Sequence, residues 1–209
     1  IWQNALGFES LEESINQIGK NQILVEEIIE VLEILIDKVD FKEIDIELPY
    51  KQPLKLHARY TRDQILVAFG LSSFDKKSSS REGVAENQYL KTELLFINLI
   101  KSEEDFSPTT MYDDYAISET LFHWQSQNSS RPEKGKGLSY INHLREDKII
   151  LLFVREKAKD ENNNTMGYVF IGDAKFVESE GAKPMNIKWE LNEPMPHYLW
   201  SQSAKMSIG

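Results

Sequence analysis

Hydrophobic residues recur with helical spacing over residues 8–39. Ten positions separated by alternating steps of three and four residues carry nine apolar side chains, and they are Phe8, Leu11, Ile15, Ile18, Gln22, Val25, Ile29, Leu32, Ile36 and Val39. Such a heptad-like seam is typical of helices that pack lengthwise against a neighbour. Ser10 and Glu13 have the spacing of a capping box, and Gly19 predicts a break between two helices. We therefore predict a coiled-coil-like helical connector over residues 1–50, which packs against another domain or a second copy of the chain.

Residues 51–209 are predicted to form a second domain of a different kind. The two prolines within residues 48–53 indicate a linker. Thr61 is placed to cap a short helix over 62–69 that stops at Gly70. Short apolar or alternating runs follow, with turn-rich loops between them, at 94–100, 149–154, 167–172, 174–177 and 186–191. This pattern favours an α+β fold in which a mostly antiparallel sheet, or a small β-barrel, carries a few helices.

Residues 121–127 alternate between two kinds of side chain. If they form a strand, one face carries Phe122, Trp124 and Ser126. The other face then carries His123, Gln125 and Gln127. The aromatic face suits a core, whereas amide groups both donate and accept hydrogen bonds and can therefore read base edges. The alternative is that the aromatic rings are core residues and the amides simply face solvent.

The residues just before this segment combine aromatic rings with carboxylates, because Tyr112, Asp113, Asp114 and Tyr115 are consecutive. A cytosine that has left its duplex needs a ring to stack on and an acceptor for its exocyclic amino group, and these residue types supply both. We predict a base-binding set in which Trp124 is the member best suited to a core position instead. The set is Tyr112, Asp113, Asp114, Tyr115, His123, Trp124, Gln125 and Gln127.

The charge of the chain is unevenly distributed. The formal net charge is −10, but residues 1–50 hold 12 of the 34 acidic residues and only three of the 24 basic ones. Residues 51–209 are therefore close to neutral, at −1, and can present a basic face to DNA while the acidic connector faces away. We predict salt-dependent contacts to DNA phosphates from two clusters of basic residues, which contain Lys76, Lys77, Arg81, Arg131, Lys134 and Lys136.

The sequence lacks the residues that several kinds of catalytic and metal sites require. The chain has no Cys, which excludes disulfides, thiolate nucleophiles and Cys-bound metals. Its four His residues are scattered, and it has no Gly-rich phosphate loop. We therefore expect no catalytic residue, metal site or cofactor in this chain, with a His-based enzyme as the weakest alternative. Missing Cys and the lack of any apolar run of membrane-spanning length favour a cytoplasmic protein without a membrane partner. Because the chain begins at Ile1, we expect it to be a piece of a longer protein.

Six blocks of sequence, taken in order, resemble a known family. They are REGV at 81–84, SPTT at 107–110, YDDYAIS at 112–118, LFHWQSQ at 121–127, LFVRE at 152–156 and PMNIKW at 184–189. Together they make residues 57–200 similar to the domain of unknown function that ends many bacterial DEAD/DEAH-type helicases. The LFHWQSQ block is long and unusual in composition, and it is the most specific of the six.

The resemblance implies a parent protein with nuclease and helicase domains upstream of this chain, which would use ATP and Mg²⁺. It further implies a Type IV restriction endonuclease of phage defence that attacks DNA containing 5-methylcytosine or 5-hydroxymethylcytosine, with this chain as its target-recognition domain. We expect a β-barrel-like reader of SRA/PUA type, or a B3-like pseudobarrel, that flips the modified base out of double-stranded DNA. The alternative is a dimerisation or assembly module of the same enzyme, forming a homodimer through the helical seam and reading no base.

Overall fold

The computed structural model describes residues 10–37, 44–73, 75–76, 78, 83–100 and 114–206. In chain order its elements are α1 (Leu11–Gly19), α2 (Gln22–Asp37), β1 (Arg59–Tyr60), α3 (Arg62–Ala68), β2 (Val84–Asn87), β3 (Thr92–Asn98), β4 (Tyr115–Ala116), β5 (Leu121–Gln125), α4 (Gly135–Ile141), β6 (Ile149–Arg155), β7 (Tyr168–Glu180), β8 (Asn186–Leu191) and α5 (His197–Met206). None of the helices in these ranges is both long and apolar enough to cross a bilayer.

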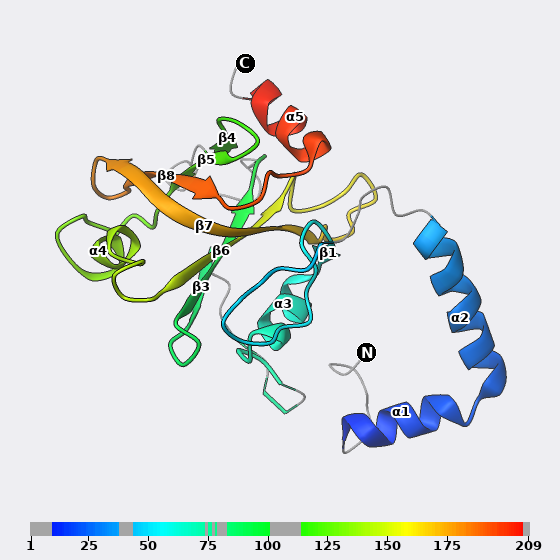
Figure 1. Ribbon diagram of the computed structural model, residues 1–209. Coiled ribbons are helices and arrows are strands. Elements are labelled where there is room, and N and C mark those ends of the chain that lie inside the picture. Colours follow the sequence, from blue (N-terminus) through cyan, green and yellow to red (C-terminus); the bar gives the residue numbers. More distant parts are fainter. Residues whose placement is uncertain are drawn as a thin grey trace.

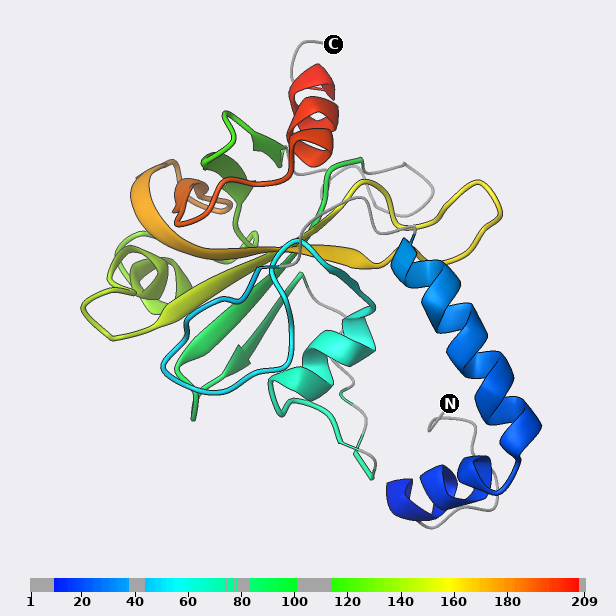
Figure 2. The same cartoon turned by 45° about the vertical axis from the view of Figure 1, so that its right-hand side comes forward.

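The two N-terminal helices confirm the predicted break near Gly19. Helix α1 begins after Ser10, whose hydroxyl oxygen accepts a hydrogen bond from the Glu13 backbone N–H at 3.1 Å, and it ends at Gly19. Helix α2 begins three residues later, at Gln22. Both helices extend away from the sheet in Figures 1 and 2. The ends of the predicted seam, Phe8 and Val39, lie outside the described residues.

The rest of the described chain is built around one sheet in the order β2-β3-β6-β7-β8-β5-β4, with β1 paired to β7. Every strand pairing is antiparallel except that of β3 with β6, which run parallel. The predicted α+β class and the mostly antiparallel sheet are therefore confirmed. Among the described strands the sheet is open, and β2 and β4 are its edges.

The central strands are buried on both faces. On β3, Leu95 and Ile97 belong to one hydrophobic core, whereas Leu94 and Phe96 belong to a second core on the opposite face. Helix α3 covers the second core, and α4 and α5 contribute to the first. Strands covered on both faces need apolar side chains at every position, which explains the uninterrupted runs at 94–97 and 149–154.

The first core also contains side chains from the outer strands, such as Phe122 of β5 and Trp189 of β8. The sheet therefore curves around this core, and the opposite face of β8, β5 and β4 is left open. Thr61 caps helix α3 as predicted, and Gln64 completes a capping box with it. The runs predicted at 167–172 and 174–177 form a single strand instead, because Gly172 continues it through a register shift with β6 at φ +102°.

Candidate functional site

Strand β5 has the two faces that its alternation predicts. Phe122 and Trp124 are 1% and 5% exposed and lie in the first core, where the Trp124 ring makes an edge contact with Tyr140 at 5.3 Å between centroids. His123 and Gln125 lie on the opposite face and are partly exposed. The strand thus anchors itself in the core through one set of side chains and holds the other set toward solvent on a rigid backbone.

A row of four side chains crosses the open face from the edge of the sheet inward. Tyr115 on β4 pairs with His123 on β5, His123 pairs with Lys188 on β8, and Lys188 pairs with Glu178 on β7. The Tyr115 and His123 rings stack at 4.6 Å with 16° between their planes. Lys188 donates to Glu178 at 2.5 Å, and this hydrogen bond raises the pKa of the Lys188 ammonium. From the edge of the sheet inward, the row therefore carries an aromatic ring, an imidazole, a cation and a carboxylate.

A second row lies beside the first, toward the turn between β7 and β8. Gln125 pairs in register with Asn186, which pairs with Glu180. The Gln125 amide donates to the Asn186 side-chain oxygen at 2.8 Å. The first row, with Asn186 and Glu180 of the second, lines a pocket of about 350 Å³. The full lining is Tyr115, His123, Glu178, Ser179, Glu180, Asn186 and Lys188. We call this the β5 pocket, and its size is within the range of small-molecule sites.

Other members of the predicted base-binding set do not line the β5 pocket. Asp114 is 8% exposed, and its carboxylate accepts the Gln125 backbone N–H at 2.8 Å, so it fastens the start of β4 to β5. The Gln127 side-chain oxygen lies 3.0 Å from the Tyr140 hydroxyl and accepts from Ser130 at 3.1 Å. Trp124, Asp114 and Gln127 therefore have structural partners inside the domain, and we assign them structural roles.

Several predicted residues lie outside the described ranges, namely Tyr112, Asp113, Lys77 and Arg81. Arg131 and Lys134 form an isolated β-bridge with each other just before α4. This loop lies beside the β7–β8 turn, because the Ser130 carbonyl accepts the Lys183 N–H at 3.0 Å. It is therefore next to the Asn186 end of the β5 pocket, while Lys76 lies in the segment before β2, at the far edge of the sheet.

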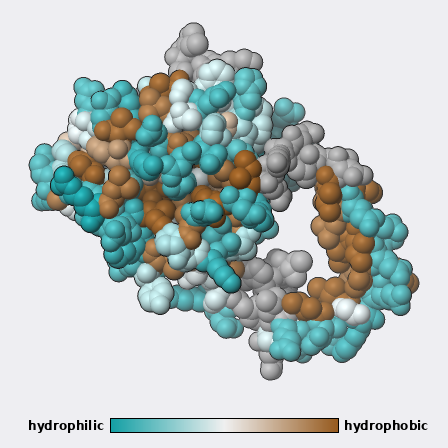
Figure 3. Space-filling view, in the orientation of Figure 1, coloured by the Kyte–Doolittle hydropathy of each residue, from teal (hydrophilic) through white to brown (hydrophobic). Residues whose placement is uncertain are grey.

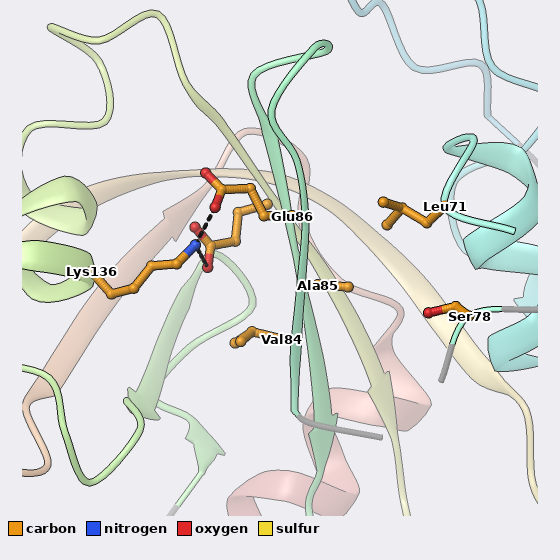
Figure 4. A pocket seen from close by; sticks show the side chains of 7 residues that line it. Leu71, Ser78, Val84, Ala85, Glu86 and Lys136 are labelled. Atoms are coloured by element: carbon orange, nitrogen blue, oxygen red, sulfur yellow. Dashed lines mark hydrogen bonds and ion pairs between the residues drawn. The ribbon is translucent and has the colours of Figure 1, made fainter. Parts of the chain in front are cut away.

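A different polar cluster lies beside a second pocket of about 260 Å³ at edge strand β2. Lys136 reaches from α4 to Glu86 of β2 at 2.5 Å and to Glu93 of β3 at 3.0 Å (Figure 4). Lys148, which precedes β6, contacts the same two carboxylates at 2.6 and 2.7 Å. We call these four residues the charge cluster. Two cations and two anions balance each other here, so the ammonium of Lys136, predicted to contact DNA, is engaged within the fold.

Burial makes the charge cluster a structural unit. Glu93 is fully buried and Lys148 is 8% exposed. Burial alone would raise the pKa of Glu86, but the hydrogen bonds from Lys136 and Lys148 outweigh it and lower that pKa. Burial and the nearby Glu93 carboxylate raise the pKa of the Tyr140 hydroxyl well above its usual value. The lowered pKa of Glu86 and the raised pKa of Tyr140 each favour the form that the group already has near neutral pH, which suits a structural cluster better than an acid–base catalyst.

No local pattern in the sequence marks the part of the β5 pocket that comes from β7 and β8. Glu178, Glu180, Asn186 and Lys188 are separated from Tyr115 by more than 60 residues. The alternation within residues 186–191 indicates which of them share a face, but nothing local says that β8 lies beside β5. No group of three or more His, Asp or Glu among the described residues is arranged to hold a metal ion.

Comparison with known proteins gives one family and a set of distant structural likenesses. The family model described as "Domain of unknown function (DUF3427)" matches residues 54–203. No curated protein sequence matches the chain.

Three solved structures illustrate the likeness of fold. The SUVH5 SRA domain in complex with hemi-methylated CG DNA is 11% identical with a TM-score of 0.42, over 72% of this chain and 97% of that one. Arabidopsis thaliana SUVH6 in complex with SAM is 12% identical with a TM-score of 0.41, over 87% of this chain and 34% of that one. The 5-hydroxymethylcytosine-specific restriction enzyme AbaSI is 18% identical with a TM-score of 0.36, over 93% of this chain and 59% of that one. At these identities and TM-scores the likenesses assign no role to any residue of this chain.

Proposed function

We propose that this chain, which belongs to the DUF3427 family, binds double-stranded DNA that contains 5-methylcytosine or 5-hydroxymethylcytosine. The observation that carries the proposal is the β5 pocket, where the stacked Tyr115 and His123 rings adjoin Lys188 and Glu178 on one open face of the sheet. Side chains on a sheet are held more rigidly than side chains on loops, so this arrangement is organised before a ligand arrives.

The chemistry of the pocket matches that of an unpaired cytosine. A base can stack on the Tyr115 ring, and such a contact is worth about 1–3 kcal/mol. The exocyclic amino group of cytosine donates a hydrogen bond, and Glu178 and Glu180 are carboxylate acceptors within reach of the same pocket. The cytosine carbonyl and ring nitrogen accept hydrogen bonds, which Lys188 and the Asn186 amide can donate.

The modification itself is small, so it must be read by shape. Burying one methyl group is worth only about 0.8 kcal/mol. If the protein touched the methyl group only from the groove of an intact duplex, the contact would add little more than this small free energy to binding. A base that enters a pocket exposes its whole Watson–Crick edge and its 5-position together, which favours flipping. Arg131 and Lys134, on the loop beside the Asn186 end of the pocket, would hold phosphates of the strand that carries the flipped base.

For the parent protein, we propose a Type IV restriction endonuclease similar to SauUSI, in which this chain is the target-recognition domain. In that protein it would direct upstream ATPase and nuclease domains, and the chain itself would catalyse nothing. The support for this part is the ordered set of sequence blocks at 81–84, 107–110, 112–118, 121–127, 152–156 and 184–189, most of all LFHWQSQ. The rival function, an assembly module, is supported by the exposed apolar surface of α2.

Fluorescence anisotropy with three duplexes that differ only in one central cytosine, unmodified, methylated or hydroxymethylated, tests the proposal. We expect a modified duplex to bind more tightly, and we expect Tyr115→Ala to weaken that binding by about tenfold, the loss of one stacked base. Tyr89→Ala is the matched control, because Tyr89 is 94% exposed in the turn between β2 and β3, at the far edge of the sheet.

A fluorescent adenine analogue next to the modified cytosine would report flipping, since its emission rises when its stacked neighbour leaves the duplex. Equal affinity for all three duplexes would refute modified-base reading. Equal effects of Tyr115→Ala and Tyr89→Ala would place any reading outside the β5 pocket.

A further inference from the structure

Helix α2 presents an apolar surface that the rest of the described chain leaves uncovered. Nine of its side chains are between 41% and 72% exposed, namely Ile23, Leu24, Ile28, Ile29, Val31, Leu32, Ile34, Leu35 and Ile36. Figure 3 shows them as a continuous hydrophobic band along the side of the helix that is turned toward the sheet domain, with hydrophilic residues along the outer side. Patches of this extent on a protein surface mark interaction sites.

The band is too wide for a simple helix pair. At about 100° per residue, the polar side chains of α2 gather in an arc of roughly 80°, and apolar residues occupy roughly 240° of the remainder. A two-stranded coiled coil covers only a narrow seam. A helix that is apolar over most of its circumference is normally surrounded by more than one neighbour. The occupant must therefore contact α2 from at least two sides, as a groove between two helices does.

The charges of the connector indicate the chemistry of that groove. Residues 10–37 contain seven acidic residues and a single base, Lys20. Most acids of α2 lie in the narrow polar arc, but Glu27 projects inside the apolar arc, between Ile34 and Val31. A carboxylate enclosed at that position is costly to bury unless a cation pairs with it. Helix α2 contains no Lys or Arg, so a second copy of it could not supply that cation.

We infer that α2 docks in a groove of a partner protein surface whose floor is apolar and whose rim carries Lys or Arg, with one of those cations paired to Glu27. Docking would remove the nine exposed side chains from water and would neutralise the connector at the same time. This inference does not depend on the proposed reading of modified DNA, because α2 and the β5 pocket share no residue.

The probe is a synthetic helical hairpin with a Leu-lined groove and a rim of Lys residues. The control is the same hairpin with Glu in place of each rim Lys. Binding to the full chain is followed by fluorescence anisotropy at low ionic strength. We expect the Lys hairpin to bind at least tenfold more tightly than the Glu hairpin. We further expect Glu27→Gln to weaken binding of the Lys hairpin at least fivefold, whereas Glu33→Gln, in the centre of the polar arc, changes it by less than twofold.

Sedimentation equilibrium of the chain alone accompanies these titrations, with circular dichroism to verify that each variant keeps its helices. Equal binding of the two hairpins, or no binding of either, would overturn the inference, as would equal effects of Glu27→Gln and Glu33→Gln. Self-association that Leu35→Ala abolishes would also overturn it, because a second copy would then be the occupant.

Discussion

Two polar clusters lie on the same sheet and differ in how completely their groups are satisfied. In the charge cluster, Lys136 and Lys148 each contact both Glu86 and Glu93, and Glu93 is fully buried. In the β5 pocket, by contrast, the four cross-strand neighbours are all partly or fully exposed around an open volume of about 350 Å³.

The difference separates a structural role from a binding role. Charges that are removed from water and balanced by internal partners stabilise one arrangement of α4, β2, β3 and the start of β6, and they have little left to offer a ligand. Rings, amides and charges that remain hydrated pay less of that cost and keep hydrogen-bonding capacity for a partner. The presence of polar residues beside a pocket therefore indicates binding only where those residues are not already saturated.

The largest effect should come from breaking the charge cluster. Glu93→Gln leaves two cations facing one carboxylate, and removal of one partner from a buried ion pair costs about 3–5 kcal/mol of the free energy of unfolding. Chemical denaturation measures that loss. The double variant Glu93→Gln, Lys148→Met should lose less than the sum of the two single variants, because the second change removes the charge that the first left unpaired. A loss below about 0.5 kcal/mol for Glu93→Gln, typical of a surface substitution, would show that the cluster does not stabilise the fold.

Acid should weaken the fold in two stages. His143 is 1% exposed, its Nε2 atom accepts the Phe176 N–H at 3.0 Å, and burial lowers its pKa. The unfolded chain therefore takes up a proton at higher pH than the folded chain does, and stability falls below about pH 6.5, by at most about 1.4 kcal/mol per pH unit for this group. His57, whose pKa burial also lowers, acts in the same window.

The second stage comes from the charge cluster. The lowered pKa of Glu86 gives stability that is present above its unfolded value, about 4.3, and is lost as the pH falls through the folded value. Denaturant titrations at a series of pH values should show both stages in the wild type, and His143→Gln should flatten the upper one and leave the lower one. An unchanged upper slope in His143→Gln would assign that stage to other groups.

The smallest effect on stability should come from the open pocket. Glu178→Gln removes the carboxylate beside Lys188, and because this pair is exposed we expect no measurable change in the free energy of unfolding. Binding to DNA should change instead, because Glu178 no longer neutralises the Lys188 cation and the pocket becomes more positive toward the DNA. A plot of the logarithm of the association constant for DNA against the logarithm of the salt concentration should steepen in slope by up to about one unit. Glu161→Gln, on an exposed loop, is the control. A steeper slope in both variants would attribute the effect to net charge alone.

Much of the fold follows from local patterns in the sequence. The break at Gly19, the cap at Thr61 and the two faces of residues 121–125 are visible there, because caps and periodicity depend on neighbours a few residues away. The same reasoning correctly gave Phe122 to the core. Trp124, the member of the predicted base-binding set that the pattern marked as best suited to a core position, is packed against Tyr140.

The composition of the β5 pocket and the contacts of Lys136 depend instead on which distant strands lie side by side. Strand β8 lies beside β5, and β3 runs parallel to β6, because those pairings bury both faces of the central strands and close the curved sheet over its core. Pairing of distant strands depends on the packing of the whole domain and leaves no mark at the positions that it joins. Local periodicity thus indicates which side chains share a face of each element. Tertiary structure alone decided that Lys188 and Glu178 line the same pocket as Tyr115 and that two carboxylates hold Lys136. Tyr115 is more than 60 positions away from Lys188 and Glu178, and Lys136 is more than 40 positions away from Glu86 and Glu93.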